Sequence, residues 1–293
     1  EKAPNKRTSF LGGLRSGFNV GDLGKSLGRL AGIGGALQLL RSTLRLVREG
    51  LVESFKAAVQ FEAQLAQLQA VTGINNDELQ RLERNVLDVA GTTKFTSAQI
   101  VALQTELGKL GFTVEEIEGA TLAVAETAQA LGEQVGPVAQ KIGQILNQYN
   151  LTAAETVNVS DTLVSVINSS ALSFESFGTA LQYVGPLGAE VGTSFRETST
   201  AMAILADNGF TASRIGTGLR GILTELSSTG KDLTTVINEL AGAEISLGEA
   251  VDLVGKRNAA QLITLIDNNE QLQDQENKYY SVGAAAIASA QQI

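Results

Sequence analysis

Apolar residues recur at alternating steps of three and four positions along residues 23–68, with only two serines breaking the row. A row of more than six heptads at this spacing is typical of a helix that supercoils with other helices. We name its apolar members the seam and predict that they form an oligomer contact. A core helix of a large bundle would show a similar pattern, and this alternative stays open. The predicted seam is Leu30, Ile33, Leu37, Leu40, Leu44, Val47, Leu51, Ala58, Phe61, Leu65 and Leu68.

Nine glycines lie between Gly12 and Gly35, just before and within the first part of this row. Each glycine inside a helix costs about 1 kcal/mol, so the first part of the row is predicted to be looser than the rest. We expect a flexible, basic, Gly-rich segment over 1–21 and a long amphipathic helix of the coiled-coil type over 22–73. The firm part, from about Ala36 to Val71, would span roughly 50 Å at 1.5 Å per residue.

A second pattern marks helix starts downstream. In a capping box, a Ser, Thr or Asn side chain accepts from the backbone N–H three residues on, and a Glu there reaches back to the cap. Five pairs fit: Asn75/Glu78, Thr113/Glu116, Thr152/Glu155, Ser194/Glu197 and Ser246/Glu249. Gly73, Gly111 and Gly192 stand two residues before three of these pairs, where a glycine suits the left-handed residue that ends the preceding helix.

Between these marks the apolar residues keep a helical spacing, and no convincing alternation of period two occurs. The predicted fold is therefore all-α, with the long N-terminal helix followed by a Gly-rich core of helical hairpins over 74–255. Residues 232–254 suggest shorter helices. One further long helix is expected over 256–293, with Leu262, Leu265, Ile266 and Leu272 on its apolar face. Because that helix runs into an alanine-rich end without a cap, we expect the chain to continue in a longer polypeptide.

The residue types that are missing from the chain exclude several classes of functional site. The 293 residues include no Cys and no His, so disulfides, thiolate zinc sites, imidazole bases and Ser-His-Asp triads are excluded. The capping glutamates already have a structural duty, and the carboxylates Glu115, Glu116 and Glu118 suit a solvated helix start. We therefore predict that the protein is not an enzyme and has no catalytic, cofactor-binding or metal site.

One glycine pattern invites a different interpretation. Gly216-Thr-Gly-Leu-Arg-Gly221 matches G-x-G-x-x-G, which binds a pyrophosphate only when it follows a buried strand and opens a helix. The residues before it, 211–215, do not resemble a strand, and no βαβ unit surrounds them. Small residues that let helices approach closely are the preferred explanation.

Charge is distributed unevenly along the chain. Residues 1–60 hold ten Lys or Arg against four Asp or Glu, whereas residues 61–293 hold 12 against 27. The basic side chains flank the seam without interleaved aromatic residues, so no specific nucleic-acid binding is expected. The longest apolar run, Leu30 to Leu40, is too short to span a bilayer.

Several short motifs follow one another along the chain in a characteristic order. They are Phe61-Glu62, Val71 to Gly73, Thr93 to Ser97, Ala206 to Gly209 and Gly216 to Arg220. This set resembles the core region of phage tail tape measure proteins over about Phe55 to Gly230. The sharpest matches are Thr93–Ser97, Val184–Gly188 and Leu205–Leu219.

The resemblance implies a largely helical tail protein of a virion or prophage, assembled in the host cytoplasm and located in the tail lumen or tip. It implies a homo-oligomer, a trimer or hexamer about the tail axis, with tail tube, hub and tail-tip proteins as partners. Such a protein is a template around which tube subunits polymerise, and it leaves before the DNA at infection. Tape measure proteins are usually much longer, so the chain would be a fragment, a processed form or a short relative.

The alternative hypothesis comes from a different class. Residues Val20 to Leu51 combine the apolar seam with a basic flank, which would suit a helix lying in a membrane interface. On this interpretation the protein is membrane-active and inserts its N-terminal segment into the host envelope.

Overall fold

The computed structural model describes residues 58–278, and every regular element in that range is a helix. The predicted all-α fold is therefore confirmed for this part of the chain. The predicted segment 1–21, the long helix as far as residue 57 and the alanine-rich end beyond 278 lie outside the described residues. The coiled-coil character of the N-terminal helix stays a prediction. The chain divides into two compact units, 1–60 and 61–293, and the description that follows concerns the second.

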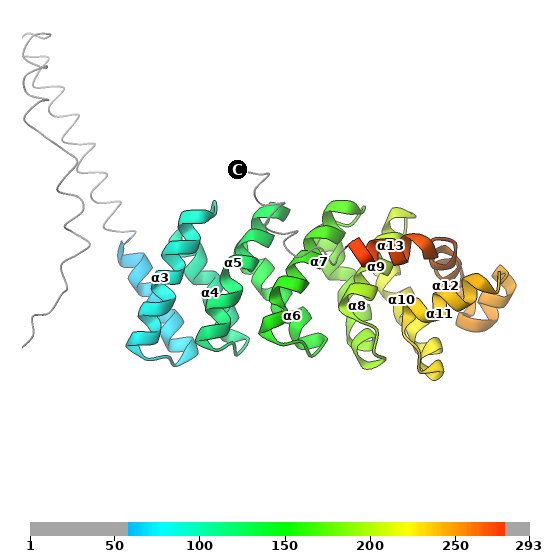
Figure 1. The fold of residues 1–293 in the computed structure, drawn as a ribbon, viewed down its shortest axis with the longest axis horizontal. Coiled ribbons are helices and arrows are strands. Elements are labelled where there is room, and N and C mark those ends of the chain that lie inside the picture. Colours follow the sequence, from blue (N-terminus) through cyan, green and yellow to red (C-terminus); the bar gives the residue numbers. More distant parts are fainter. Residues whose placement is uncertain (1–57, 279–293) are drawn as a thin grey trace, which may run out of the picture. The chain divides into compact units, whose positions relative to one another are not determined.

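A helix over residues 58–72 leads into the series of helices labelled in Figure 1. The α-helices are α3 (Asn76–Thr92), α4 (Ser97–Lys109), α5 (Val114–Leu131), α6 (Val135–Gln148), α7 (Thr156–Ser169), α8 (Phe174–Glu190), α9 (Phe195–Asp207), α10 (Ala212–Leu226), α11 (Leu233–Gly242), α12 (Leu247–Asp267) and α13 (Asn269–Lys278). Two short 3₁₀ turns, η2 (Ala153–Glu155) and η3 (Ser227–Thr229), precede α7 and follow α10.

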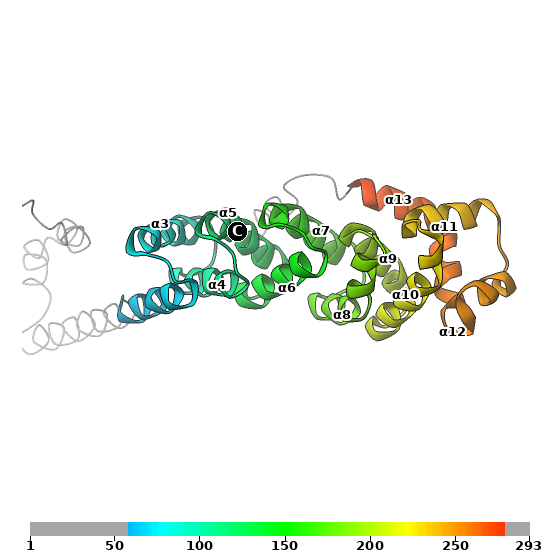
Figure 2. The same ribbon diagram turned by 90° about the horizontal axis from the view of Figure 1, so that it is seen from below.

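The helices pack in two layers, seen as two rows in Figure 2. Helices α4, α6, α8, α10 and α12 form one layer, and α3, α5, α7 and α9 form the other. Within each layer a helix packs on the next but one in the chain. Successive helix pairs begin at Asn76, Val114, Thr156 and Phe195, which is roughly 40 residues per pair, the size of a two-helix repeat unit. In such a stack each pair buries its apolar face only against its neighbours.

The three glycines that are predicted to end helices do so. Gly73, Gly111 and Gly192 adopt φ values of 70°, 87° and 80°, in the left-handed region that favours glycine. After Gly111 the Phe112 amide donates to the Leu107 carbonyl oxygen at 3.3 Å, so the chain leaves α4 through a Schellman turn. The prediction for these three glycines is confirmed.

Four of the five predicted capping boxes are also confirmed. They open α3, α5, α9 and α12 at Asn75, Thr113, Ser194 and Ser246, each with its glutamate bonded back to the cap. The same device opens α4, where Thr96 caps and Gln99 replaces the glutamate.

The box predicted at Thr152 is wrong. The Thr152 side chain makes no capping bond, because residues 153–155 form the 3₁₀ turn η2 and the α-helix begins only at Thr156. There the Thr156 hydroxyl donates to the Ala153 carbonyl oxygen at 2.6 Å. Glu155 instead accepts from the Asn158 amide at 2.8 Å.

The core runs through the whole series between the two layers. Every helix from 58–72 to α13 contributes buried side chains, for example Leu68, Leu103, Leu163 and Leu219. The helical faces predicted from apolar spacing, such as Leu82, Val86 and Val89 on α3, point into this core.

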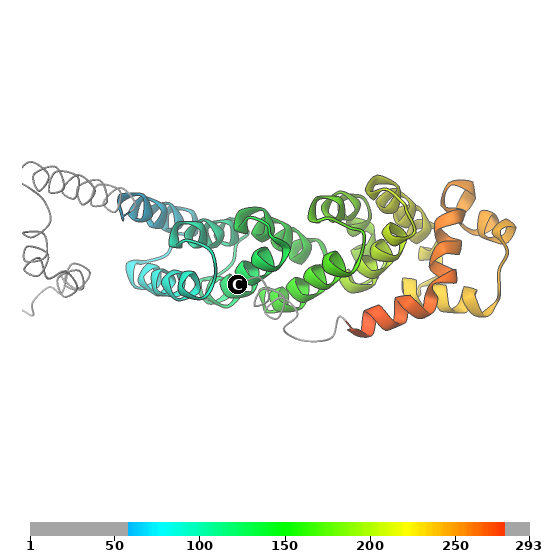
Figure 3. The same ribbon diagram turned by 90° about the horizontal axis from the view of Figure 1, so that it is seen from above.

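The C-terminal helices depart from the prediction. Residues 232–254 do form shorter helices, and Gly255 has a left-handed φ of 77° that kinks α12. The expected single long helix after this point is wrong within the described residues, because α12 ends at Asp267 and α13 begins at Asn269. This break lets α13, red in Figure 3, pack on both α9 and α11. The predicted apolar face is nevertheless buried: Leu262, Leu265, Ile266 and Leu272 all lie in the core.

Candidate interaction groove

The G-x-G-x-x-G pattern lies wholly inside helix α10, which follows helix α9 and no strand. A Cβ atom added at Gly216 would overlap with the Ala180 carbonyl oxygen of α8, and one at Gly218 would overlap with the Gln261 amide of α12. These glycines therefore allow close helix packing, and the interpretation of the pattern as a packing motif is confirmed.

Within residues 58–278, no group of three or more Asp, Glu, His or Cys side chains is arranged to hold a metal ion. Of the helices in this range, none has the length and apolar character needed to cross a bilayer.

A polar groove separates α6 from α8 in the layer of even-numbered helices. α8 packs closely on α10, and α4 on α6, but α6 and α8 touch only lightly. Two adjoining hollows of about 470 and 700 Å³ lie between them and share Lys141, Gln144, Gly178 and Gln182 as lining residues. We call this feature the α6–α8 groove.

The two walls of the groove match in register, since α6 and α8 run in the same direction. Gly178 faces Lys141, and seven residues on, Gly185 faces Gln148. A Cβ atom at either glycine would overlap with the side chain opposite. Two glycines one heptad apart on α8 thus let Lys141 and Gln148 of α6 lie across the floor of the groove.

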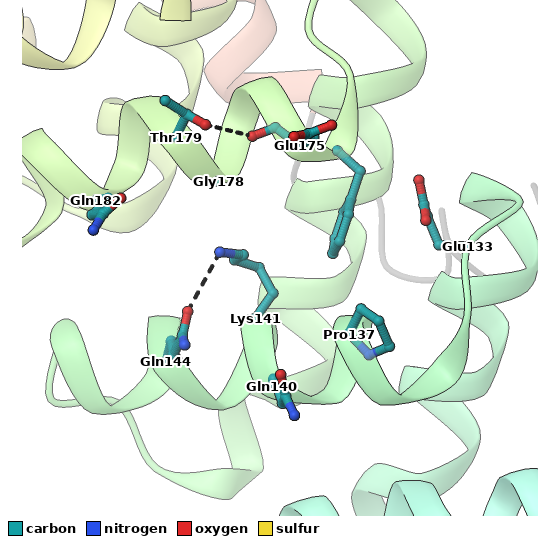
Figure 4. A pocket seen from close by; sticks show the side chains of 10 residues that line it. Glu133, Pro137, Gln140, Lys141, Gln144, Glu175, Gly178, Thr179 and Gln182 are labelled. Carbon is teal, nitrogen blue, oxygen red and sulfur yellow. Dashed lines mark hydrogen bonds between the residues drawn. The ribbon is translucent and has the colours of Figure 1, made fainter. Parts of the chain in front are cut away.

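Lys141 is the cation of this groove. Its chain reaches from α6 towards α8, and its ammonium lies between Gln144 and Gly178 (Figure 4). The ammonium donates a long hydrogen bond of 3.4 Å to Gln144 Oε1, and no carboxylate of the described residues lies within 4.0 Å of Nζ. Partial burial lowers the pKa of Lys141, because desolvation disfavours the charged form.

Helix α8 has a gap in its main-chain hydrogen bonds beside the groove. Pro186 stands inside α8 and has no N–H, so the carbonyl oxygen of Gln182 lacks the donor that an α-helix normally supplies. Both residues line the groove. The groove therefore combines the Lys141 ammonium, side-chain amides and, in its first hollow, the carboxylates of Glu133 and Glu175.

Sequence reasoning missed this groove. The run 173–188 stands out through its small residues, and Gly178, Gly185 and Pro186 within it are the available signal. The sequence does not indicate that this run faces α6, a helix about 37 residues earlier.

The predicted seam falls into two parts. Its members from Leu30 to Leu51 lie outside the described residues. At the other end, Leu65 and Leu68 are buried in the core of the second unit and Phe61 packs against that core, whereas Ala58 is exposed. Leu65 and Leu68 therefore contact the chain's own helices, and an oligomer contact through the earlier members stays a prediction. The membrane hypothesis for Val20 to Leu51 likewise stays a prediction.

Comparison with known proteins gives consistent matches. The family model described as phage-related minor tail protein matches residues 83–288. The tape measure protein of Pneumococcus phage Dp-1 is 28% identical over 187 residues, which are 64% of this chain and 16% of that protein. The probable tape measure protein of Escherichia phage P2 is 27% identical over 175 residues, 59% of this chain and 22% of that protein.

A third relative, the probable tape measure protein of Clostridium phage phiCD119, is 21% identical over 242 residues, 75% of this chain and 26% of that protein. The chain thus spans between about a sixth and a quarter of the length of these relatives. No solved structure matches it. The family match covers well over half of the chain, and the resemblance stated from its motifs is confirmed. The chain belongs to the phage tail tape measure family.

Proposed function

We propose that this chain is a structural segment of a tape measure protein, which templates the length of a phage tail tube and is released at infection. The observation that carries the proposal is the family match over residues 83–288, which includes most of the series of stacked helices. Its place would be the lumen or tip of the virion tail, in contact with tube, hub and tail-tip proteins.

We propose that this work is divided between two parts of the chain. A single continuous helix adds about 1.5 Å per residue along its axis. In the second unit the chain reverses direction between successive helices, so the same number of residues covers a much shorter distance. We assign length measurement to continuous helix of the kind predicted over 22–73, and we assign to the stacked helices the role of a folded module that docks other tail components.

We further propose that copies of the chain associate about the tail axis, as a trimer or hexamer, through the seam members Leu30 to Leu51. The periodic row supports this contact, because a helix with an apolar row of that length is stabilised by pairing with another helix.

The proposal is tested in the phage or prophage that encodes the chain. A helical insert of 56 residues, eight heptads, placed after Leu51 should lengthen the tail by roughly 84 Å, as measured by electron microscopy. The same insert in the α7–α8 turn, after exposed Ala171, should leave tail length unchanged. Particles that have ejected their DNA should have lost the chain on immunoblots. Tails of parent length with both inserts would contradict the template role, and equal lengthening by both would contradict the division of work between the two parts.

A further inference from the structure

The α6–α8 groove has the chemistry of a site for an extended polypeptide. We propose that it binds an extended segment of a partner protein, with an Asp or Glu side chain of that segment paired to Lys141. This inference does not depend on the length-measuring role, because it rests on the groove alone.

The ammonium of Lys141 favours an anionic group at its own position in the groove. Lys141 is partly buried, and its ammonium has no carboxylate partner among the described residues that line the groove. Glu133 lies at the other end of the hollow, and the Glu175 carboxylate points away from the ammonium (Figure 4). A carboxylate on a ligand would supply the missing charge-assisted hydrogen bond, which is stronger than a bond between neutral groups.

The side-chain amides of the groove are suited to hydrogen bonds with a peptide backbone. Gln144, Gln148 and Gln182 line the groove, and each amide carries both a donor and an acceptor. A peptide unit offers the complementary pair, one N–H and one C=O.

The length of the groove sets the size of the ligand. Its α6 wall runs from Pro137 to Gln148, which is roughly 17 Å at 1.5 Å per residue. An extended chain covers that distance with about five residues at 3.3 Å each. The hollows of about 470 and 700 Å³ lie in the size range of ligand sites.

Two segments of this sequence lie outside the described residues. Residues 279–293 contain no Asp or Glu, and residues 1–57 hold ten Lys or Arg against four Asp or Glu. Neither is an acidic stretch, and the occupant we infer is an acidic segment of a partner protein.

The test uses the full chain, immobilised, and a displayed library of random decapeptides. Enriched peptides should share one Asp or Glu at a fixed position, and a synthetic copy of the best peptide should bind the chain in solution. Lys141→Gln should weaken that binding at least about tenfold, since a charge-assisted bond is lost. Lys141→Glu should instead enrich peptides with Lys or Arg at the same position.

Two further variants separate binding from folding. Gln182→Trp changes an exposed groove residue, so the fold should persist while the added bulk abolishes peptide binding. Lys256→Gln removes an exposed lysine of α12 that does not line the groove, and it should bind peptides like the parent chain. Library peptides without a shared acidic position, or binding that survives both Lys141→Gln and Gln182→Trp in folded protein, would overturn the proposal.

Discussion

At the scale of single residues, two glycines of this chain differ in their backbone conformation. Gly111 ends α4 with a φ of +87°, and Gly119 lies inside α5 with ordinary helical backbone. Neither has a heavy atom within 4 Å of an added Cβ atom, so substitution at both sites leaves packing unchanged. The two positions therefore differ in backbone conformation alone.

This difference predicts opposite effects of one substitution. Gly111→Ala should lower the free energy of unfolding by about 1 kcal/mol, because an L-residue resists the left-handed region. Gly119→Ala should raise it by about 0.5–1 kcal/mol, because alanine loses less backbone entropy in a helix. Urea unfolding of the full chain, followed by circular dichroism, measures both. Equal effects of the two substitutions would show that the φ of Gly111 is not what constrains that site.

At the scale of elements, the two sequence patterns differ in what they can predict about a helix. A capping box is complete within four residues, which is why the spacing of residue types alone identifies Asn75, Thr113, Ser194 and Ser246 as helix caps. The seam is a different kind of signal. Periodicity identifies a face to be buried, but it does not identify the partner, and Leu65 and Leu68 pack against helices of the chain itself.

The earlier seam members carry the prediction of self-association. Sedimentation of the full chain should give a defined oligomer, and Leu40→Asp combined with Val47→Asp should reduce it to a monomer, because charges at core positions must be desolvated on association. Gln38→Asp with Ser42→Asp adds the same charge outside the seam and should leave the oligomer intact. If the parent chain sediments as a monomer, the prediction that the seam forms an oligomer contact is wrong.

At the scale of the whole molecule, each helix of the second unit contacts mainly the helices next to it in the stack. Helices α3 to α6 have their contacts at one end of the series, and α10 to α12 have theirs at the other. In such a stack stability is local, since each pair interacts only with adjacent pairs. The lightly packed step from α6 to α8 interrupts one of the two layers.

Hydrogen exchange of the full chain should report this locality. Leu103 is fully buried in α4, and Leu103→Ala should cost about 2–5 kcal/mol locally, with faster exchange in α3 to α6. Exchange in α10 and α12 should stay near that of the parent chain. Leu219→Ala, a fully buried position in α10, should give the reciprocal pattern. Faster exchange across every helix in both variants would instead indicate one cooperative unit.

Several features of this protein were determined by the sequence itself. The helical class, most helix starts and the left-handed glycines depend on residues a few positions apart, so short-range steric and hydrogen-bonding rules sufficed. The family followed from motifs in a fixed order. The misplaced start at Thr152 shows the limit of these rules, since a local 3₁₀ turn displaced the helix start by a few residues.

Only the tertiary structure decided which helices meet. Contacts between residues far apart in the chain determine the packing within the two layers, the break between α12 and α13, and the α6–α8 groove. Lys141 and Gly178 illustrate the point, because neither is unusual in its own helix. Their significance arises from facing each other, and apolar periodicity tells which face of a helix is buried but not against which neighbour.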